Sequence, residues 1–300
     1  MKKTLITIYG PTAVGKTKLS IDLAKLLKCE IISCDSRQFY KELSVGTAIP
    51  SPKELEAVRH HCIHNKSINE IYTIKEFQNE AFEIINKLFK IHNFIILVGG
   101  SGLYMDSIIN GFDEFPEIDK MVRDKLNLKF QKFGIKYLQN KLEELDPVYY
   151  LKVDINNHRR LIRALEVCIS SKKPYSSFTG KKTNKNTFNV LNFAIEMNRD
   201  ELYDKINNRV DHMISQGLVE EVKSLINFKN VNALNTVGYK ELFLYFEEKC
   251  SLAESIIEIK KNTRRYAKRQ MTWLNSKKNI KKINHTISAQ EVKRTYIDFK

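Results

Sequence analysis

Residues 10–17 read Gly10-Pro11-Thr12-Ala13-Val14-Gly15-Lys16-Thr17 and match the pattern GxxxxGK[ST]. The run Thr4–Tyr9 before them has the length of a buried strand, and Lys16–Leu27 after them has a helical pattern. A glycine-rich loop between a strand and a helix lets backbone N–H groups surround a diphosphate, while the helix N-terminus and Lys16 add positive charge. We therefore predict a P-loop formed by these eight residues, with the Thr17 hydroxyl as a ligand of Mg²⁺.

Further strand and helix patterns alternate along the chain after this loop. Glu30–Cys34 and Val190–Glu196 have strand patterns, and Phe94–Val98 is a continuous apolar run that ends at two glycines. Between Glu30–Cys34 and Phe94–Val98, the stretch Glu76–Leu88 has apolar residues at helical spacing. This alternation predicts an α/β fold, with a P-loop parallel sheet core covered by helices on both faces.

The strand signal disappears between residues 113 and 187, where helical patterns rich in Lys and Arg replace it. We predict that residues 113–187 form an inserted helical domain within an α/β core built from residues 1–112 and 188–300. From Arg199 onward we expect only helices, which complete the core and end in a basic C-terminal region.

Positive charge is concentrated in two segments of the chain. Formal net charge is +15, with 50 Lys and Arg against 35 Asp and Glu. Residues 260–300 hold 13 basic and 2 acidic residues, and residues 120–190 hold 16 basic and 6 acidic residues. On a helix over residues 256–274, six cations fall opposite the apolar arc. This distribution favours a polyanionic partner, although Lys-rich helix surfaces can also be merely solvated.

Asp35 follows the strand Glu30–Cys34 directly, so it should lie at the same sheet edge as the P-loop. A carboxylate there can act as a general base, or it can simply cap a helix. Most P-loop hydrolases need an acidic residue at the end of another strand, and the strand Phe94–Val98 ends in glycines instead. A small-molecule kinase and a non-catalytic RNA-binding nucleotide sensor are both compatible with these features.

Seven motifs occur in order over most of the chain: GPTAVGKT, DSRQFY, VGTAIP, GGSGLY, RRLIRALEV, VGYKEL and TRRYAKRQMTWL. In this combination the chain resembles the tRNA dimethylallyltransferase (tRNA isopentenyltransferase) family. The resemblance implies transfer of a dimethylallyl group from dimethylallyl diphosphate to N6 of the adenosine 3′-adjacent to the anticodon in tRNA, with release of diphosphate. The P-loop would then hold the diphosphate of the prenyl donor, together with Mg²⁺. A related prenyltransferase acting on free nucleotides is an alternative, and the large basic insertion favours tRNA over a free nucleotide.

The resemblance also implies roles for individual residues. Asp35, Ser101 and Lys16 match catalytic positions. The helical insertion would bind the tRNA anticodon arm. Residues that match tRNA-contact positions are Asp35, Ser36, Arg37, Gln38, Ser101, Arg123, Arg159, Arg160, Leu161, Ile162 and Arg163.

Three positions depart from the family's usual pattern. Ile49 stands where the family usually has Lys, His64 where it usually has Asp, and Asn157 where it usually has Asp. These departures concern local contacts, because the P-loop, Asp35, Ser101 and Arg163 are all present. We expect a monomeric, cytoplasmic enzyme with no membrane partner, since no apolar run approaches the roughly 18–20 residues of a membrane span and the N-terminus resembles no signal peptide.

Overall fold

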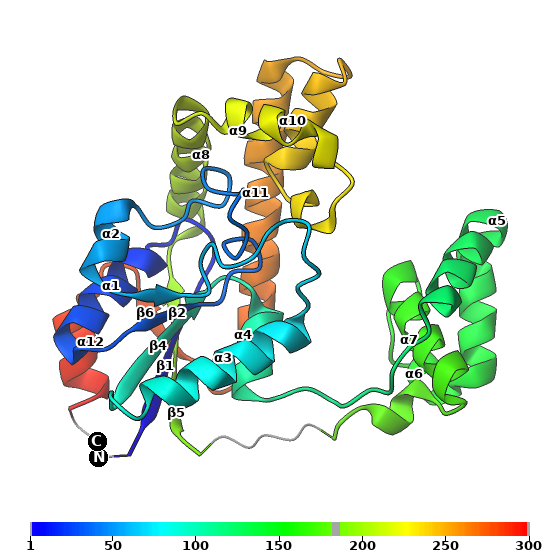
Figure 1. The fold of residues 1–300 in the computed structure, drawn as a ribbon, viewed down its shortest axis with the longest axis horizontal. Helices are drawn as coiled ribbons and strands as arrows, with labels where there is room; N and C mark the ends of the chain where they lie inside the picture. Colours follow the sequence, from blue (N-terminus) through cyan, green and yellow to red (C-terminus); the bar gives the residue numbers. More distant parts are fainter. Residues whose placement is uncertain (1, 182–186, 299–300) are drawn as a thin grey trace. The chain divides into compact units, whose positions relative to one another are not determined.

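The computed structural model describes residues 2–181 and 187–298, and the chain divides into two compact units (Figure 1). The core unit is Met1–Ile109 together with Asn186–Lys300. The insertion unit is Asn110–Lys185. The core unit contains the sheet, and the described part of the insertion unit contains helices and no strand.

Six strands of the described residues form one parallel sheet in the order β3-β2-β4-β1-β5-β6. The strands are β1 (Thr4–Tyr9), β2 (Ile31–Ser33), β3 (His60–His61), β4 (Phe94–Gly99), β5 (Asn189–Glu196) and β6 (Lys281–Asn284). The predicted parallel α/β fold is therefore confirmed.

Strand β6 corrects the expectation that only helices follow Arg199. It lies at the edge of the sheet, where it pairs with β5, and Ile283 is its one buried residue. A single buried side chain in a Lys- and Asn-rich segment produces no alternating pattern. The two-residue strand β3 at the other edge escaped prediction because it is too short to show a period.

Helices cover both faces of the sheet because the central strands are apolar on both sides. In β1, Ile6 and Ile8 face the side covered by helices α1 (Lys16–Leu27) and α12 (Ala289–Tyr296). The alternate residues Leu5 and Tyr9 face helices α3 (Ile74–Leu88) and α4 (Gly102–Ile109) on the other side. Because all the strands are parallel, their carboxyl ends lie at one edge of the sheet, where loops can gather.

A helical layer stands at that edge in the core unit (Figure 1). The short helix α2 (Pro52–Ala57), which lies between β2 and β3 in the chain, is not part of this layer. The layer consists of α8 (Arg199–Ser215), α9 (Leu218–Ser224), α10 (Tyr239–Phe246) and α11 (Leu252–Asn275), with the short helices η2 (Ile226–Phe228) and η3 (Asn232–Leu234) between α9 and α10. These helices share a hydrophobic cluster that includes Val210, Leu218, Tyr239 and Ile259. Leu43 of the loop after β2 packs into the same cluster, so this layer is joined to the sheet.

The insertion unit has a hydrophobic core of its own. Helices α5 (Lys120–Leu145) and α7 (His158–Ser171) pack through Leu138, Leu142, Leu161 and Leu165, and α6 (Pro147–Tyr150) and η1 (Tyr175–Phe178) complete the unit. Inside α5, Gly134 adopts a φ of 69°, which interrupts the regular helix. Among the described helices, none combines the length and the apolar character that crossing a bilayer requires.

Candidate active site

The loop between β1 and α1 has the backbone geometry of an anion-binding loop. Gly15 caps α1 with a φ of 97°, a left-handed conformation that favours glycine. No side chain of the described residues caps this helix end, so its first N–H groups remain available to an anion. The Thr12 backbone N–H donates to Oε1 of Gln270 on α11 at 3.0 Å, which ties the loop to the helical layer.

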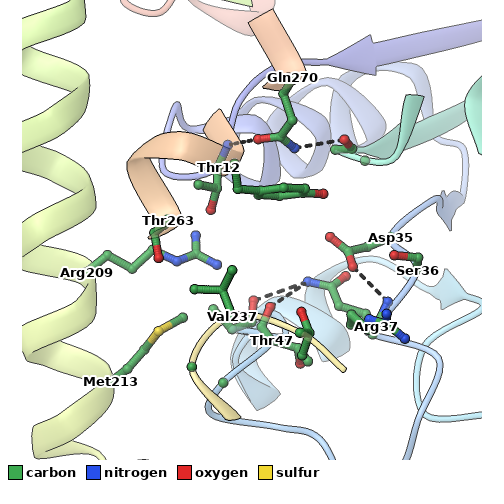
Figure 2. Close-up of a pocket in the computed structure, with 18 of the residues that line it drawn as sticks. Thr12, Asp35, Ser36, Arg37, Thr47, Arg209, Met213, Val237, Thr263 and Gln270 are labelled. Atoms are coloured by element: carbon green, nitrogen blue, oxygen red, sulfur yellow. Dashed lines mark hydrogen bonds between the residues drawn. The ribbon is translucent and has the colours of Figure 1, made fainter. Parts of the chain in front are cut away.

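A cavity of about 540 Å³ opens in front of this loop, within the core unit (Figure 2). We call it the site cavity. Its lining includes Thr12, Lys16 and Thr17 from the loop, residues 35–38 after β2, residues 46–48, Arg209 and Met213 of α8, residues 235–238, and Thr263, Tyr266 and Gln270 of α11. The site cavity thus collects segments that are far apart in the sequence.

Two cations in the wall of the site cavity form no ion pair with any described residue. Burial, with a smaller contribution from the neighbouring Arg209, lowers the pKa of Lys16 to about 7, and the Asp35 carboxylate partly opposes this shift. Burial also lowers the pKa of Arg209. Lys16 donates only to the carbonyl of Pro11, at 2.7 Å. Two desolvated cations without an acidic partner favour the binding of an anion between them.

Arg209 has no motif around it, and the sequence analysis missed it. It is seven residues after the buried Leu202, so at about 100° per residue the two lie on nearly the same face of α8. A cation on the apolar face of an amphipathic helix is the signal that could have identified it. Figure 2 shows its guanidinium reaching from α8 into the site cavity.

Asp35 lies on the opposite side of the site cavity from Arg209 (Figure 2). Its Oδ1 accepts a hydrogen bond from the backbone N–H of Arg37 at 3.0 Å. Its other oxygen, Oδ2, accepts no hydrogen bond from a described residue, and it remains available inside the cavity. The helix cap considered from the sequence is not formed, because a turn and not a helix follows β2. One oxygen of Asp35 stabilises that turn, and the other is available to accept a proton.

Ser101 is held directly beside Asp35. Its Oγ accepts a hydrogen bond from the backbone N–H of Ser36 at 3.1 Å, although the two residues follow different strands. Burial, with a smaller contribution from the Asp35 carboxylate, raises the pKa of the neighbouring Tyr266 to about 12. Tyr266 is thus a neutral neighbour of the Asp35 carboxylate at physiological pH.

Arg37 and Gln38 are engaged by the protein itself. The Arg37 guanidinium donates to the carbonyls of Asn232 and Asn235 at 3.2 and 3.4 Å. Gln38 Nε2 donates to the carbonyls of Thr47 and Ala48, both at 3.3 Å. In this structure both side chains hold loops that border the site cavity.

Arginines of the insertion unit gather around one buried acid. Glu166 is fully buried, and it forms ion pairs with Arg123 and, at 3.5 Å, with Arg163. Arg163 also lies over the ring of Phe115, 5.3 Å from its centroid. A buried carboxylate that pairs with two arginines fixes their positions and lowers their freedom to rearrange.

The remaining residues of the motif on α7 divide by burial. Arg159 and Arg160 are exposed, whereas Leu161 and Ile162 are buried in the core of the insertion unit. Asn157 caps α7, since its Oδ1 accepts from the backbone N–H of Arg160 at 3.3 Å. The side chains of Leu161 and Ile162 therefore support the helix from inside, and only the arginines of this stretch face outward.

On the basic face of α11, some cations form ion pairs within the protein and others do not. Lys260 pairs with Asp211 and Lys261 with Glu258, each at 2.6 Å. Arg265 and Lys268 are exposed and form no ion pair with a described residue. On the opposite arc, the Trp273 ring packs 4.7 Å from the ring of Tyr9, centroid to centroid, so it anchors α11 on the sheet.

The donor atoms around the 10–17 loop suit Mg²⁺. The Thr17 hydroxyl lines the site cavity and forms no hydrogen bond with a described residue. Mg²⁺ prefers oxygen ligands and often takes most of them from substrate phosphates and water. The described residues contain no group of three His, Cys, Asp or Glu side chains placed to hold a metal. A Mg²⁺ ion held by Thr17 and a bound diphosphate fits this arrangement, and a metal held by protein ligands alone does not.

The sequence and the fold are similar to those of known proteins. The tRNA dimethylallyltransferase of Flavobacterium johnsoniae is 50% identical over 296 residues, which cover 97% of this chain and 96% of that protein. A solved tRNA isopentenylpyrophosphate transferase from Bacillus halodurans is 37% identical, with a TM-score of 0.70, and the match covers 95% of this chain and 90% of that one. A eukaryotic dimethylallyltransferase acting on tRNA has a TM-score of 0.80 at 25% identity, over 99% and 77% of the two chains.

The family match begins inside the motif that follows β2 and ends just beyond α11. It spans residues 38–277 and is described as IPP transferase. This range includes Ser101, the insertion unit, Arg209 and the helical layer, but the 10–17 loop and Asp35 lie before it. The chain therefore belongs to the IPP transferase family.

Proposed function

We propose that this protein transfers a dimethylallyl group from dimethylallyl diphosphate to N6 of the adenosine 3′-adjacent to the anticodon in tRNA. The observation that carries the proposal is the composition of the site cavity. Two unpaired cations at an anion-binding loop stand opposite a carboxylate with an available oxygen. Apolar side chains such as Met213 and Val237 complete the lining and suit a prenyl chain.

The cations and the loop would act on the leaving group. As the bond between the allylic carbon and the diphosphate oxygen breaks, negative charge grows on the diphosphate. The N–H groups of the 10–17 loop, Lys16 and Arg209 are placed to stabilise this charge. Thr17 would hold Mg²⁺, which when bound neutralises part of the diphosphate charge.

Asp35 would act on the acceptor. N6 of adenine forms the new bond to the allylic carbon as the bond from that carbon to the diphosphate oxygen breaks. The nitrogen would then carry a positive charge, so it must lose one of its protons, and because its lone pair is delocalised into the ring, removing that proton also makes it a better nucleophile. Oδ2 of Asp35 is available to accept that proton. The adenine must leave its stack to enter the site cavity, where Ser101 beside Asp35 can hydrogen-bond to it.

Exposed cations would hold the RNA. We propose that Arg159 and Arg160, with Arg123 and Arg163 fixed by Glu166, contact the anticodon arm from the insertion unit. Because the described residues of one chain supply both the diphosphate-binding loop and the Asp35 carboxylate, we propose that the enzyme acts as a monomer. Its proposed place of action is the cytoplasm, where the tRNA substrate is found.

The proposal is tested by incubating the protein with radiolabelled dimethylallyl diphosphate, Mg²⁺ and unmodified tRNA. Digestion of the tRNA should yield labelled N6-dimethylallyl adenosine, and tRNA with another base in place of this adenosine should remain unlabelled. Intact tRNA that gains no label would refute the proposal. Transfer of phosphate from ATP to a small acceptor would favour a kinase instead.

Replacing Arg209 by Gln should weaken binding of dimethylallyl diphosphate and raise the stability of the free protein. A hydrogen bond from a charged group contributes about 1.5–3 kcal/mol, so the KM for the donor should rise by about 10-fold or more. The melting temperature without ligand should rise, because a desolvated cation that forms no ion pair with a described residue opposes folding. Lys205→Gln removes the same charge from an exposed position of α8, where Lys205 pairs with Glu201 at 3.1 Å, so the donor KM should be unchanged and the melting temperature should not rise. A donor KM equal to that of this control would exclude Arg209 from the diphosphate site.

Replacing Arg265 and Lys268 together by Gln should weaken tRNA binding and flatten its dependence on salt. Each phosphate contact that is lost should reduce the slope of log K against log salt by about 1. The matched control is Lys260→Gln with Lys261→Gln, which removes the same charge from cations already paired with Asp211 and Glu258. Equal slopes for the two double variants would mean that this face of α11 is solvated in the complex.

A further inference from the structure

One carboxylate outside the reaction centre receives an unusual set of hydrogen bonds. Glu221 of α9 accepts from the backbone N–H groups of Ser44, Val45 and Gly46 at 2.9, 2.7 and 3.0 Å. The hydroxyl of Tyr239 also donates to its Oε1 at 2.6 Å. Glu221 forms no ion pair with a described residue, so these four donors stabilise its charge.

Consecutive N–H groups that converge on one anion define the conformation of the loop that carries them. Here the anion belongs to the protein. The loop also packs closely against Tyr239, because a Cβ on Gly46 would lie 2.6 Å from the ring of Tyr239. Tyr239 is fully buried, so its ring cannot move aside. The loop is therefore held against α10 by hydrogen bonds and by contact with the ring.

We call these contacts of Glu221 with the amides of residues 44–46 and with Tyr239 the clamp. The clamp joins two walls of the site cavity. Residues 46–48 line the cavity on one segment, and residues 235–238, which lead directly into Tyr239, line it on another. Figure 2 shows Thr47 and Val237 together on the side of the cavity away from Thr12 and Gln270. Glu221 contacts both segments, through the loop amides and through Tyr239, whereas the diphosphate loop lies elsewhere.

The clamp also explains two sequence motifs that have no part in the chemistry. Val45-Gly46-Thr47-Ala48 begins the VGTAIP motif, and Tyr239 lies in the VGYKEL motif. The first supplies the N–H groups and the small residue, and the second supplies the hydroxyl and the ring.

We propose that Glu221 is a positioning residue that sets the separation of these two walls and so selects a dimethylallyl chain over a longer prenyl chain. The inference rests on the proposed function, because it assigns this part of the site cavity to the prenyl group. Glu221 does not touch the reacting atoms. Its effect should therefore appear in the KM for the donor and in chain-length selection, and much less in kcat.

The test compares Glu221→Gln with Glu220→Gln, which removes the same charge from the adjacent, exposed position of α9. In Glu221→Gln one accepting oxygen becomes an NH₂ group, which is itself a donor and cannot accept from the backbone N–H groups of residues 44–46. The KM for dimethylallyl diphosphate should therefore rise by about 10-fold or more. The ratio of kcat/KM for dimethylallyl over geranyl diphosphate should fall. Inhibition by inorganic diphosphate should be unchanged, because the 10–17 loop is untouched. Tyr239→Phe removes one of the four donors and should act in the same direction by a smaller factor.

Hydrogen exchange gives a readout that does not depend on catalysis. The amides of residues 44–46 should exchange faster in Glu221→Gln than in Glu220→Gln, while those of β1 stay protected. Unchanged exchange at these amides would overturn the clamp. Faster exchange with an unchanged donor KM and chain-length ratio would overturn its role in selecting the donor. A wild-type protein that prenylates no tRNA would refute the proposed function, and the exchange experiment would still test the clamp.

Discussion

Replacing Asp35 by Asn should lower the rate of prenyl transfer by about 10²- to 10⁴-fold, the usual contribution of a general base. Asn keeps an Oδ1 that can accept from the Arg37 N–H, so the turn after β2 should survive. The amide cannot take a proton from N6 of adenine at neutral pH. A single-turnover rate at saturating donor and tRNA measures this step alone, and tRNA affinity should be nearly unchanged.

Asp35→Ala separates the two functions of this side chain, because it removes the turn contact as well as the base. It should lower the rate at least as much as Asn does. If the Asn variant kept the wild-type rate and only the Ala variant failed, Asp35 would serve as a cap and not as a base. A large loss of tRNA binding in the Asn variant would equally contradict the assignment.

The second large effect is expected for Lys16→Met, which should lower kcat/KM for the donor by about 10²- to 10³-fold, as for the loss of one donor to a developing anion. Met has nearly the length of Lys and can fill the same partly buried space without a charge. The loss should appear in kcat as well as in KM, because charge on the diphosphate is greatest as the allylic bond breaks. Steady-state kinetics with varied donor, and titration with inorganic diphosphate, measure both parts.

Lys18→Met is the matched control for this experiment. Lys18 lies two residues further along α1, is exposed, and pairs with Asp22 at 3.3 Å. Removing an exposed ion pair of this kind changes stability by about 1 kcal/mol at most, and it should leave the donor kinetics unchanged. A Lys16 variant that behaves like the Lys18 variant would remove Lys16 from the site.

The elements around the 10–17 loop were predictable because their patterns are local. Strand β1 and helix α1 have the predicted bounds, and β4 and β5 each extend one residue beyond the predicted run. An apolar run that ends abruptly at polar residues predicts a buried element and its bounds without knowledge of the rest of the fold. Strand β6 was not predictable, since it joins the sheet through backbone pairing with β5 and buries only Ile283.

The candidate site was predictable only in part, because some of its residues are placed by contacts between segments that are distant in the sequence. Asp35 and the 10–17 loop could be placed at one sheet edge, because parallel topology brings the ends of neighbouring strands together. Nothing local indicated that Arg209 would face them, or that Glu221 would hold the loop 44–46. Arg37 and Gln38, in turn, carry polar groups that any sequence analysis would leave free for a ligand, yet here they bind protein carbonyls.

The sequence by itself therefore determined the α/β fold, the loop between β1 and α1, and the family, because these depend on contiguous patterns and on ordered motifs. Only the tertiary structure decided which charges face the site cavity and which are neutralised. Lys16 and Arg209 are desolvated there without a partner, whereas Lys260 and Arg123 are paired with acids. The energy of a charge depends on what surrounds it in space, and packing between distant segments sets those surroundings.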